Sequence, residues 1–453
     1  MVTISLNTQV AAPHSSSLHA LDWLNFFLAA LLTGFGPFVA VHLTDHGWDP
    51  AHIGFVLSAS GFAGLITQIP GGELIDITQA RRAIVGAGAA AIALALLVIA
   101  LRPEFAWVAV AVVVQGAAGS FLGPGIAAIS LGLVGHDALA ERLGRNARFA
   151  SVGGLVSAAL MGVVGYLLAT QDIFLIAAAL LAPLLFSLAR IRASDIHFAR
   201  SCGGSDHHAT HPARTKRTNL LQNKGLLIFA VCLLLFQLAN ASLLTQLSQA
   251  LPRVEGRLSS LVVSALVVFP QIIVAALAPW AGRCAATFGR KPLLIVGLAA
   301  VPIRSTLFAL TSDPVLLVVI QLLDGLSGAT LGVLTALIVA DLTAGTGRFN
   351  LAQGLVGAAS GVGATLSTSV AGIIVEKFGY TAGLLGVTAV GLLSVVIVVS
   401  FMPETKPAAK PGGPDARSQG PPRVRSRPDD LAGGLARLVE GKVQTLLARG
   451  RKD

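Results

Sequence analysis

Two ionisable side chains lie deep inside apolar stretches of this sequence. Arg304 falls in the apolar segment 292–311 and Asp324 in the segment 314–340, at matching depths. A charge inside a membrane is costly and marks a functional site by default. The two can form a structural ion pair between neighbouring segments. Alternatively, Asp324 binds a proton or a substrate while Arg304 tunes its pKa, which makes both candidate coupling residues.

Uncharged polar side chains are also spaced along the apolar segments. Some share a helical face, as Gln237 and Asn240 do in the segment 224–249. Each can either form a hydrogen bond to a neighbouring helix or line a polar cavity at mid-membrane, and both interpretations stay open. The candidate cavity residues are Asn25, Thr33, Gln115, Gln237, Asn240, Gln271 and Asp324.

The composition requires a membrane environment for these residues. Of the 453 residues, 54% are hydrophobic and only 12% are charged, whereas soluble domains carry about 25% charged residues. This excludes ordinary soluble proteins, disordered proteins and, despite a net charge of +10, nucleic-acid binders. The sequence therefore predicts an all-α polytopic membrane protein.

Twelve stretches are long and apolar enough to span a bilayer, which takes about 20 residues. We expect two six-helix bundles in residues 1–190 and 224–402, a cytoplasmic linker at 191–223, and a basic, mostly disordered tail at 403–453. The expected spans are 18–42, 51–75, 83–101, 105–133, 147–169, 172–190, 224–249, 258–281, 292–311, 314–340, 350–375 and 380–402.

The basic residues indicate the orientation. With both termini in the cytoplasm, 27 of the 32 Lys and Arg residues fall in inward segments. Without the linker and tail, 9 Lys and Arg residues still fall in inward segments and 4 in outward segments. The positive-inside rule thus favours a multi-pass protein of the cytoplasmic (inner) membrane with both termini cytoplasmic.

The two halves repeat each other at an offset of 209 residues. Pro70 matches Pro279, and the basic pair Arg81-Arg82 matches Arg290-Lys291. The stretch 115–123 likewise matches 324–332, with Gly at the same three positions. The halves are therefore expected to be parallel structural repeats, an arrangement typical of one transporter design.

Over about residues 18–402 the chain resembles the major facilitator superfamily, in particular its bacterial efflux-type permeases. The loop motif G-x-x-x-D-x-x-G-R-[KR] of that family is similar to 72–82, where Gly72 and Asp76 precede Arg81 and Arg82. A second copy at 282–291 keeps Gly282, Gly289, Arg290 and Lys291, with Ala286 in place of the acid. The resemblance implies twelve helices in two bundles related by a pseudo-two-fold axis, with the first, fourth, seventh and tenth lining a central cavity.

The resemblance also implies a gate at these loops. An acid such as Asp76 is stabilised at the N-terminus of a neighbouring helix, here expected to be the span that begins near Asn350. The basic residues could pair with Asp137, Glu141 or Asp341, or could only obey the positive-inside rule. The candidate gating residues are Gly72, Asp76, Arg81, Arg82, Gly282, Gly289, Arg290 and Lys291.

We therefore expect a secondary-active transporter that moves a small organic solute by alternating access, as efflux coupled to protons. An uptake permease or facilitator for a sugar or small metabolite is one alternative, and a non-transporting membrane sensor or scaffold is another. No enzyme is expected, because no catalytic cluster accompanies Arg304 and Asp324 at membrane depth. We expect a monomer with membrane lipid and a small-molecule substrate as partners, and neither cofactor nor metal. Cys202, His207, His208 and His211 fit no standard zinc spacing.

Overall fold

The computed structural model describes residues 13–35, 37–204, 220–250 and 257–406. Among these residues the regular elements are all helical. The first half contains α1 Ser15–Thr33, α2 Pro37–Asp45, α3 Pro50–Ile77, α4 Arg81–Leu101, α5 Phe105–Val134, α6 Leu139–Leu167, α7 Thr170–Ala179 and α8 Leu181–Arg190. The second half contains α10 Lys224–Asn240, α11 Leu243–Ala250, α12 Arg257–Phe288, α13 Lys291–Leu310, α14 Pro314–Leu342, α15 Phe349–Phe378 and α16 Tyr380–Phe401. Short elements lie between the halves: the 3₁₀ turns η1 Ala193–Asp195 and η2 Leu220–Gln222, and the helix α9 Phe198–Ser201.

Eleven helical segments of the described chain are long and apolar enough to cross a membrane. The expected seventh span differs, because its apolar helix α10 ends at Asn240 and a separate helix, α11, follows. The first span is also two helices, α1 and α2, as is the sixth, α7 and α8. The first break lies between α1 and α2, and α2 begins at Pro37 because proline cannot continue a helix that would need its N–H group.

Several spans begin at side chains that accept from the free N–H groups of a first helical turn. Asp313 accepts from Val315 N at 2.8 Å and from Leu316 N at 3.1 Å, with Pro314 at the first position of α14. Asn223 likewise accepts from Leu226 N at 3.1 Å and starts α10. These caps satisfy N–H groups that the first turn of each helix leaves free.

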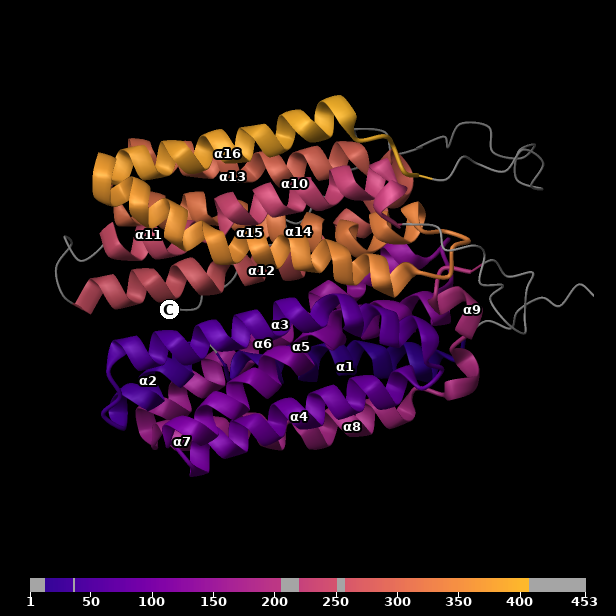
Figure 1. Cartoon of the computed structure of the whole chain (residues 1–453), viewed down its shortest axis with the longest axis horizontal. Coiled ribbons are helices and arrows are strands. Elements are labelled where there is room, and N and C mark those ends of the chain that lie inside the picture. Colours follow the sequence, from indigo (N-terminus) through magenta and orange to yellow (C-terminus); the bar gives the residue numbers. More distant parts are fainter. Residues whose placement is uncertain (1–12, 36, 205–219, 251–256, 407–453) are drawn as a thin grey trace, which may run out of the picture. The chain divides into compact units, whose positions relative to one another are not determined.

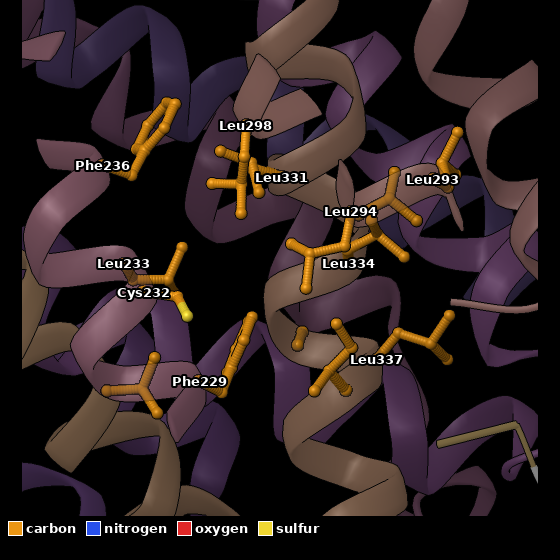
Figure 2. Packing of buried hydrophobic residues seen from close by; sticks show 14 of the residues in the cluster. Phe229, Cys232, Leu233, Phe236, Leu293, Leu294, Leu298, Leu331, Leu334 and Leu337 are labelled. Carbon is orange, nitrogen blue, oxygen red and sulfur yellow. The ribbon is translucent and has the colours of Figure 1, made fainter. Parts of the chain in front are cut away.

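The helices form two bundles that lie beside each other, one from α1 to α8 and one from α10 to α16 (Figure 1). We call the end that carries α9 and the loop between α14 and α15 the linker end. Each bundle has its own apolar core. Figure 2 shows the second core, where Phe229 and Phe236 of α10 face Leu298 of α13 and Leu334 of α14.

The two bundles meet at the linker end. The second core includes five residues from α5 and α6 of the first half: Ala127, Leu131, Leu139, Ala140 and Leu143. These lie at the linker ends of their helices, so the apolar contact between the bundles is built there.

The beginning of the linker is packed against both halves of the protein. Ile191 and Cys202 are fully buried, and His197 N donates to Gly132 O of α5 at 3.1 Å. On the other side, Phe349 N of α15 donates to Cys202 O at 3.1 Å. Residues 191–204 are therefore held between elements of both halves. The tail beyond residue 406, which we expect to be disordered, lies outside the described residues. The three linker histidines also lie outside them.

Candidate functional site

The ion pair between Arg304 and Asp324 is present in the second bundle. Arg304 Nη1 of α13 lies 2.5 Å from Asp324 Oδ1 of α14. Arg304 Nη2 also donates to Asn240 Oδ1 at the end of α10. The Arg304 side chain is 2% exposed, but that of Asp324 is 32% exposed. The cluster therefore joins three helices and presents its carboxylate to an accessible space.

Close packing of α13 against α14 holds this cluster in place. Ser327 Oγ donates to Gly297 O at 2.8 Å, and a Cβ added at Gly297 would lie 2.2 Å from Thr330 Oγ1. Beyond Arg304, the hydroxyl of Ser305 donates to Leu384 O of α16 at 2.7 Å. The small residues thus allow the approach that brings Arg304 and Asp324 together.

The other candidate cavity residues do not join this cluster. Gln115 Oε1 accepts from Ser60 Oγ of α3 at 2.7 Å, which is a contact between helices. Asn25 Nδ2 donates to Leu21 O at 2.7 Å, and Thr33 Oγ1 donates to Ala29 O at 2.8 Å, both within α1. Local bonding to the carbonyl one turn earlier satisfies such side chains without a ligand.

The remaining two, Gln237 and Gln271, make no side-chain hydrogen bond within the described residues, and Gln271 is exposed. Of the cavity set, the structure thus joins Asn240 and Asp324 through Arg304. A cavity role for the others stays a prediction.

A second buried charge cluster, in the first bundle, was missed by the sequence analysis. Asp22 of α1 is 1% exposed and accepts from Arg142 Nη2 of α6. Arg145 Nη2 lies 2.6 Å from the second carboxylate oxygen of Asp22. Arg142 Nε also donates to Asn146 Oδ1 at 2.7 Å, and Asn146 Nδ2 donates to Ser130 Oγ at 2.8 Å. The signal in the sequence was an acid within the first apolar segment.

We expect Asp22→Asn to destabilise the protein by about 2 kcal/mol. The amide keeps an acceptor for Arg142 but removes the charge that offsets this buried guanidinium, and hydrogen bonds to charged groups are worth about 1.5–3 kcal/mol. Thermal unfolding of the purified protein in detergent measures the loss. Asp45→Asn, at the exposed end of α2, is the control and should unfold like the wild type.

The first motif loop, at 72–82, makes the helix-terminus contact that the resemblance implied. Asp76 Oδ1 accepts from Asn350 N at 3.1 Å and from Asn350 Nδ2 at 2.8 Å. Asp76 Oδ2 accepts from Leu351 N at 2.8 Å, in the first turn of α15. Gly72 permits the approach, since an added Cβ would lie 2.2 Å from Asn350 O. Asp76 thus joins α3 of the first bundle to α15 of the second.

The second loop makes an equivalent contact without an acid. A Cβ at Gly282 of α12 would lie 2.4 Å from Ala140 O of α6, and one at Gly144 would lie 2.5 Å from Ala278 O. Here the two backbones approach each other directly. The bundles are therefore in contact on two sides at the linker end, by α3 with α15 and by α6 with α12.

Of the expected pairs between basic residues and acids, one is formed in the described chain. Arg290 Nε donates to Asp341 Oδ2 at 2.9 Å. Arg81, Arg82 and Lys291 do not pair with the expected acids, so this part of the prediction is wrong. Lys291 Nζ donates to Val399 O at 2.9 Å, and Arg82 Nη2 donates to Ala189 O at 3.3 Å.

Glu404 supplies an unexpected carboxylate at the second loop. Its oxygens accept from Arg290 N at 2.8 Å and from Lys291 N at 3.1 Å, at the start of α13. Partial burial acts to raise the pKa of Glu404, but these and other backbone N–H groups together hold it below its ordinary value. Gly289 turns the chain here, with a φ of +102° that suits glycine.

Arg81 forms its side-chain contact with a thiol and not with an acid. Its Nη2 lies 2.8 Å from Cys202 Sγ, and its guanidinium carbon lies 4.4 Å from the ring centroid of Phe198. Cys202 Sγ in turn donates to Asp76 O at 3.3 Å. Burial raises the pKa of the Cys202 thiol to about 11, although Arg81 opposes this shift. The thiol is therefore neutral at physiological pH and is packed into the contact at the linker end.

Comparison with known proteins identifies the family. The MFS_1 like family model matches residues 18–403. An uncharacterized MFS-type transporter of Mycobacterium tuberculosis (strain H37Rv) is 36% identical over 405 residues, covering 88% of this chain and 96% of that protein. This chain belongs to the major facilitator superfamily (MFS).

Two further matches are a local sequence similarity and a similarity of fold. The tetracycline resistance protein, class B, of Escherichia coli is 29% identical over 129 residues, or 28% of this chain and 31% of that protein. The structure of the proton:xylose symporter XylE bound to 6-bromo-6-deoxy-D-glucose superposes with a TM-score of 0.68 at 15% identity, covering 86% of this chain and 97% of XylE. The latter shows the twelve-helix MFS fold.

The expected fold class and family are thus confirmed. The protein is a multi-pass membrane transporter of the MFS and not an enzyme. Among the described residues, no group of three or more His, Cys, Asp or Glu side chains is arranged to hold a metal ion.

Proposed function

We propose that this MFS transporter exports a small organic solute in exchange for protons by alternating access. The observation that carries the proposal is the Arg304–Asp324–Asn240 cluster, which combines a buried cation with a partly exposed carboxylate. Proton coupling needs a carboxylate that reaches the transport pathway, and Asp324 is the ionisable side chain that we assign to this role.

The geometry suggests how proton binding alters the helices. A protonated Asp324 no longer balances the charge of Arg304, whereas an ionised Asp324 does. Because Arg304 also bonds Asn240, a change at Asp324 alters the contact of α13 with both α14 and α10. Proton binding would thus bias the packing of the second bundle between two arrangements.

The contacts between the bundles support the assignment of the gate. In this proposal the linker end faces the cytoplasm, in agreement with its excess of basic residues. The contacts of Asp76 with α15 and of Gly282 with α6 then close the cytoplasmic side of the pathway, and Arg81, Arg290 and Lys291 brace the two loops. Efflux is the proposed direction, in line with the local similarity to a protein named for tetracycline resistance.

The test is flux in vesicles that contain only this protein. Purified protein in liposomes would be given an inward or outward pH gradient and a panel of labelled organic cations, anions, sugars and amino compounds. We expect at least one solute to move against its concentration in the direction opposite to the protons, and the movement to stop when an ionophore collapses the gradient. Movement of a solute with the protons, or movement that the ionophore does not affect, would contradict proton-coupled export.

A further inference from the structure

A crevice of about 610 Å³ opens between the bundles at the linker end, on the side where α6 contacts α12. It is separate from the Arg304 cluster and from the α3–α15 contact. Its walls come from α1, α6 and α12 and combine aromatic rings with cations. The lining residues are Trp23, Phe26, Glu141, Arg145, Arg148, Phe149, Val152, Pro279 and Arg283.

The crevice carries more positive than negative charge. Arg145, Arg148 and Arg283 face one acid, Glu141. Within the described chain, the exposed guanidinium groups of Arg148 and Arg283 have neither an ion-pair partner nor a hydrogen-bond acceptor. Arg145 is bound to Asp22 through Nε and Nη2, which fixes its orientation and leaves Nη1 uncommitted. Three guanidinium groups are thus available to an anion.

The depth of these cations suits the phosphate level of a bilayer. Arg283 lies five residues before the end of α12, and Arg145 lies six residues after the start of α6. At about 1.5 Å per residue, both lie roughly 8–9 Å along their helices from the linker end. Long cationic side chains at this depth reach toward lipid headgroups.

The apolar part of the crevice continues away from the cations. Trp23 is 49% exposed, with its ring 6.2 Å from that of Phe149. Along α6, Val156, Leu160 and Val163 are exposed at spacings of four and three residues. They therefore lie on one face of the helix, in register with Val152 of the crevice. A hydrocarbon chain that left the crevice would follow this stripe.

We propose that the crevice binds an anionic phospholipid of the leaflet at the linker end. Its phosphate contacts Arg145, Arg148 and Arg283, and one acyl chain lies against Trp23, Phe149 and the α6 stripe. Basic pockets between transmembrane helices suit anionic headgroups, and the adjoining apolar stripe distinguishes a lipid from a free anion. Because Arg148 and Arg283 belong to different bundles, one phosphate bridges the two and stabilises their contact.

Purified full-length protein in neutral detergent provides the first test. Phosphatidylglycerol and phosphatidylcholine with identical acyl chains are titrated separately, with native mass spectrometry and the melting temperature as readouts. We expect retention of phosphatidylglycerol, with at least tenfold weaker binding of phosphatidylcholine, and a melting temperature that rises with phosphatidylglycerol. Equal binding of the two lipids would overturn the proposal, as would an equal stabilisation by inorganic phosphate alone, which would indicate an anion site only.

Substitutions then locate the site. The double variant Arg148→Gln/Arg283→Gln should weaken phosphatidylglycerol binding at least tenfold while leaving the melting temperature without lipid unchanged, since neither guanidinium has a described partner. The matched control is Arg190→Gln/Arg192→Gln, which removes the same charge from exposed positions at the same end. Equal losses in both variants would show a general charge effect and reject the crevice. Wild-type binding in the first variant would reject it as well.

Discussion

Replacement of Asp324 by Asn should abolish flux driven by a pH gradient, with a loss of at least 100-fold in reconstituted vesicles. The amide nearly matches the carboxylate in shape and keeps an oxygen beside the Arg304 guanidinium, but it binds no proton in the physiological range. The bond from Arg304 to Asn240 remains. The substitution thus removes the titratable group while changing the packing little.

The readout must separate coupling from binding. Solute exchange without a pH gradient should persist in Asp324→Asn, because alternating access itself needs no net proton movement. Asp324→Glu should retain part of the gradient-driven flux, and Asp137→Asn, at an exposed position of the linker end, should behave like the wild type. Gradient-driven flux at the wild-type level in Asp324→Asn would remove Asp324 from the coupling role.

Loss of the Asp76 carboxylate should open the linker end. Asp76→Ala leaves the backbone N–H groups of Asn350 and Leu351 without their acceptor, and the Asn350 side-chain amide keeps only Ser201 O. Hydrogen bonds from N–H groups at a helix N-terminus to a carboxylate together stabilise the closed linker end by about 3 kcal/mol. That energy corresponds to a shift on the order of 100-fold in the equilibrium between closed and open linker ends.

Cys202 provides a reporter for this shift. Its thiol is fully buried beside Asp76 O, and its pKa is raised to about 11. Alkylation needs an accessible thiolate, so the closed state should react slowly at pH 8. In a Cys284→Ser background, with Cys232 buried, maleimide labelling of Cys202 followed by mass spectrometry measures opening.

We expect labelling of Cys202 to be on the order of 100-fold faster in Asp76→Ala than in the wild type. Asp137→Ala, which removes an exposed acid from the same end, is the control and should label at the wild-type rate. Gly72→Ala should also accelerate labelling, because its Cβ meets the backbone of Asn350. Unchanged labelling in both Asp76→Ala and Gly72→Ala would show that this contact does not hold the linker end closed.

The sequence alone determined the features that depend on local pattern. Apolar length predicts where spans lie, because each helix satisfies its own backbone hydrogen bonds in lipid. The repeat and the two loop motifs indicated the family, and the matched depths of Arg304 and Asp324 predicted their ion pair. The cap of Asp76 on α15 followed from the resemblance, because a carboxylate beside free N–H groups is favourable wherever they meet.

Only the tertiary structure decided which distant groups share a buried space. Asp22 and Arg142 are 120 residues apart, as Arg81 and Cys202 are 121 apart, and no periodicity links such positions. The packing of residues 191–204 likewise depends on neighbouring helices. A buried charge or backbone group needs a partner, but several partners would satisfy it, and the packing of the helices selects one.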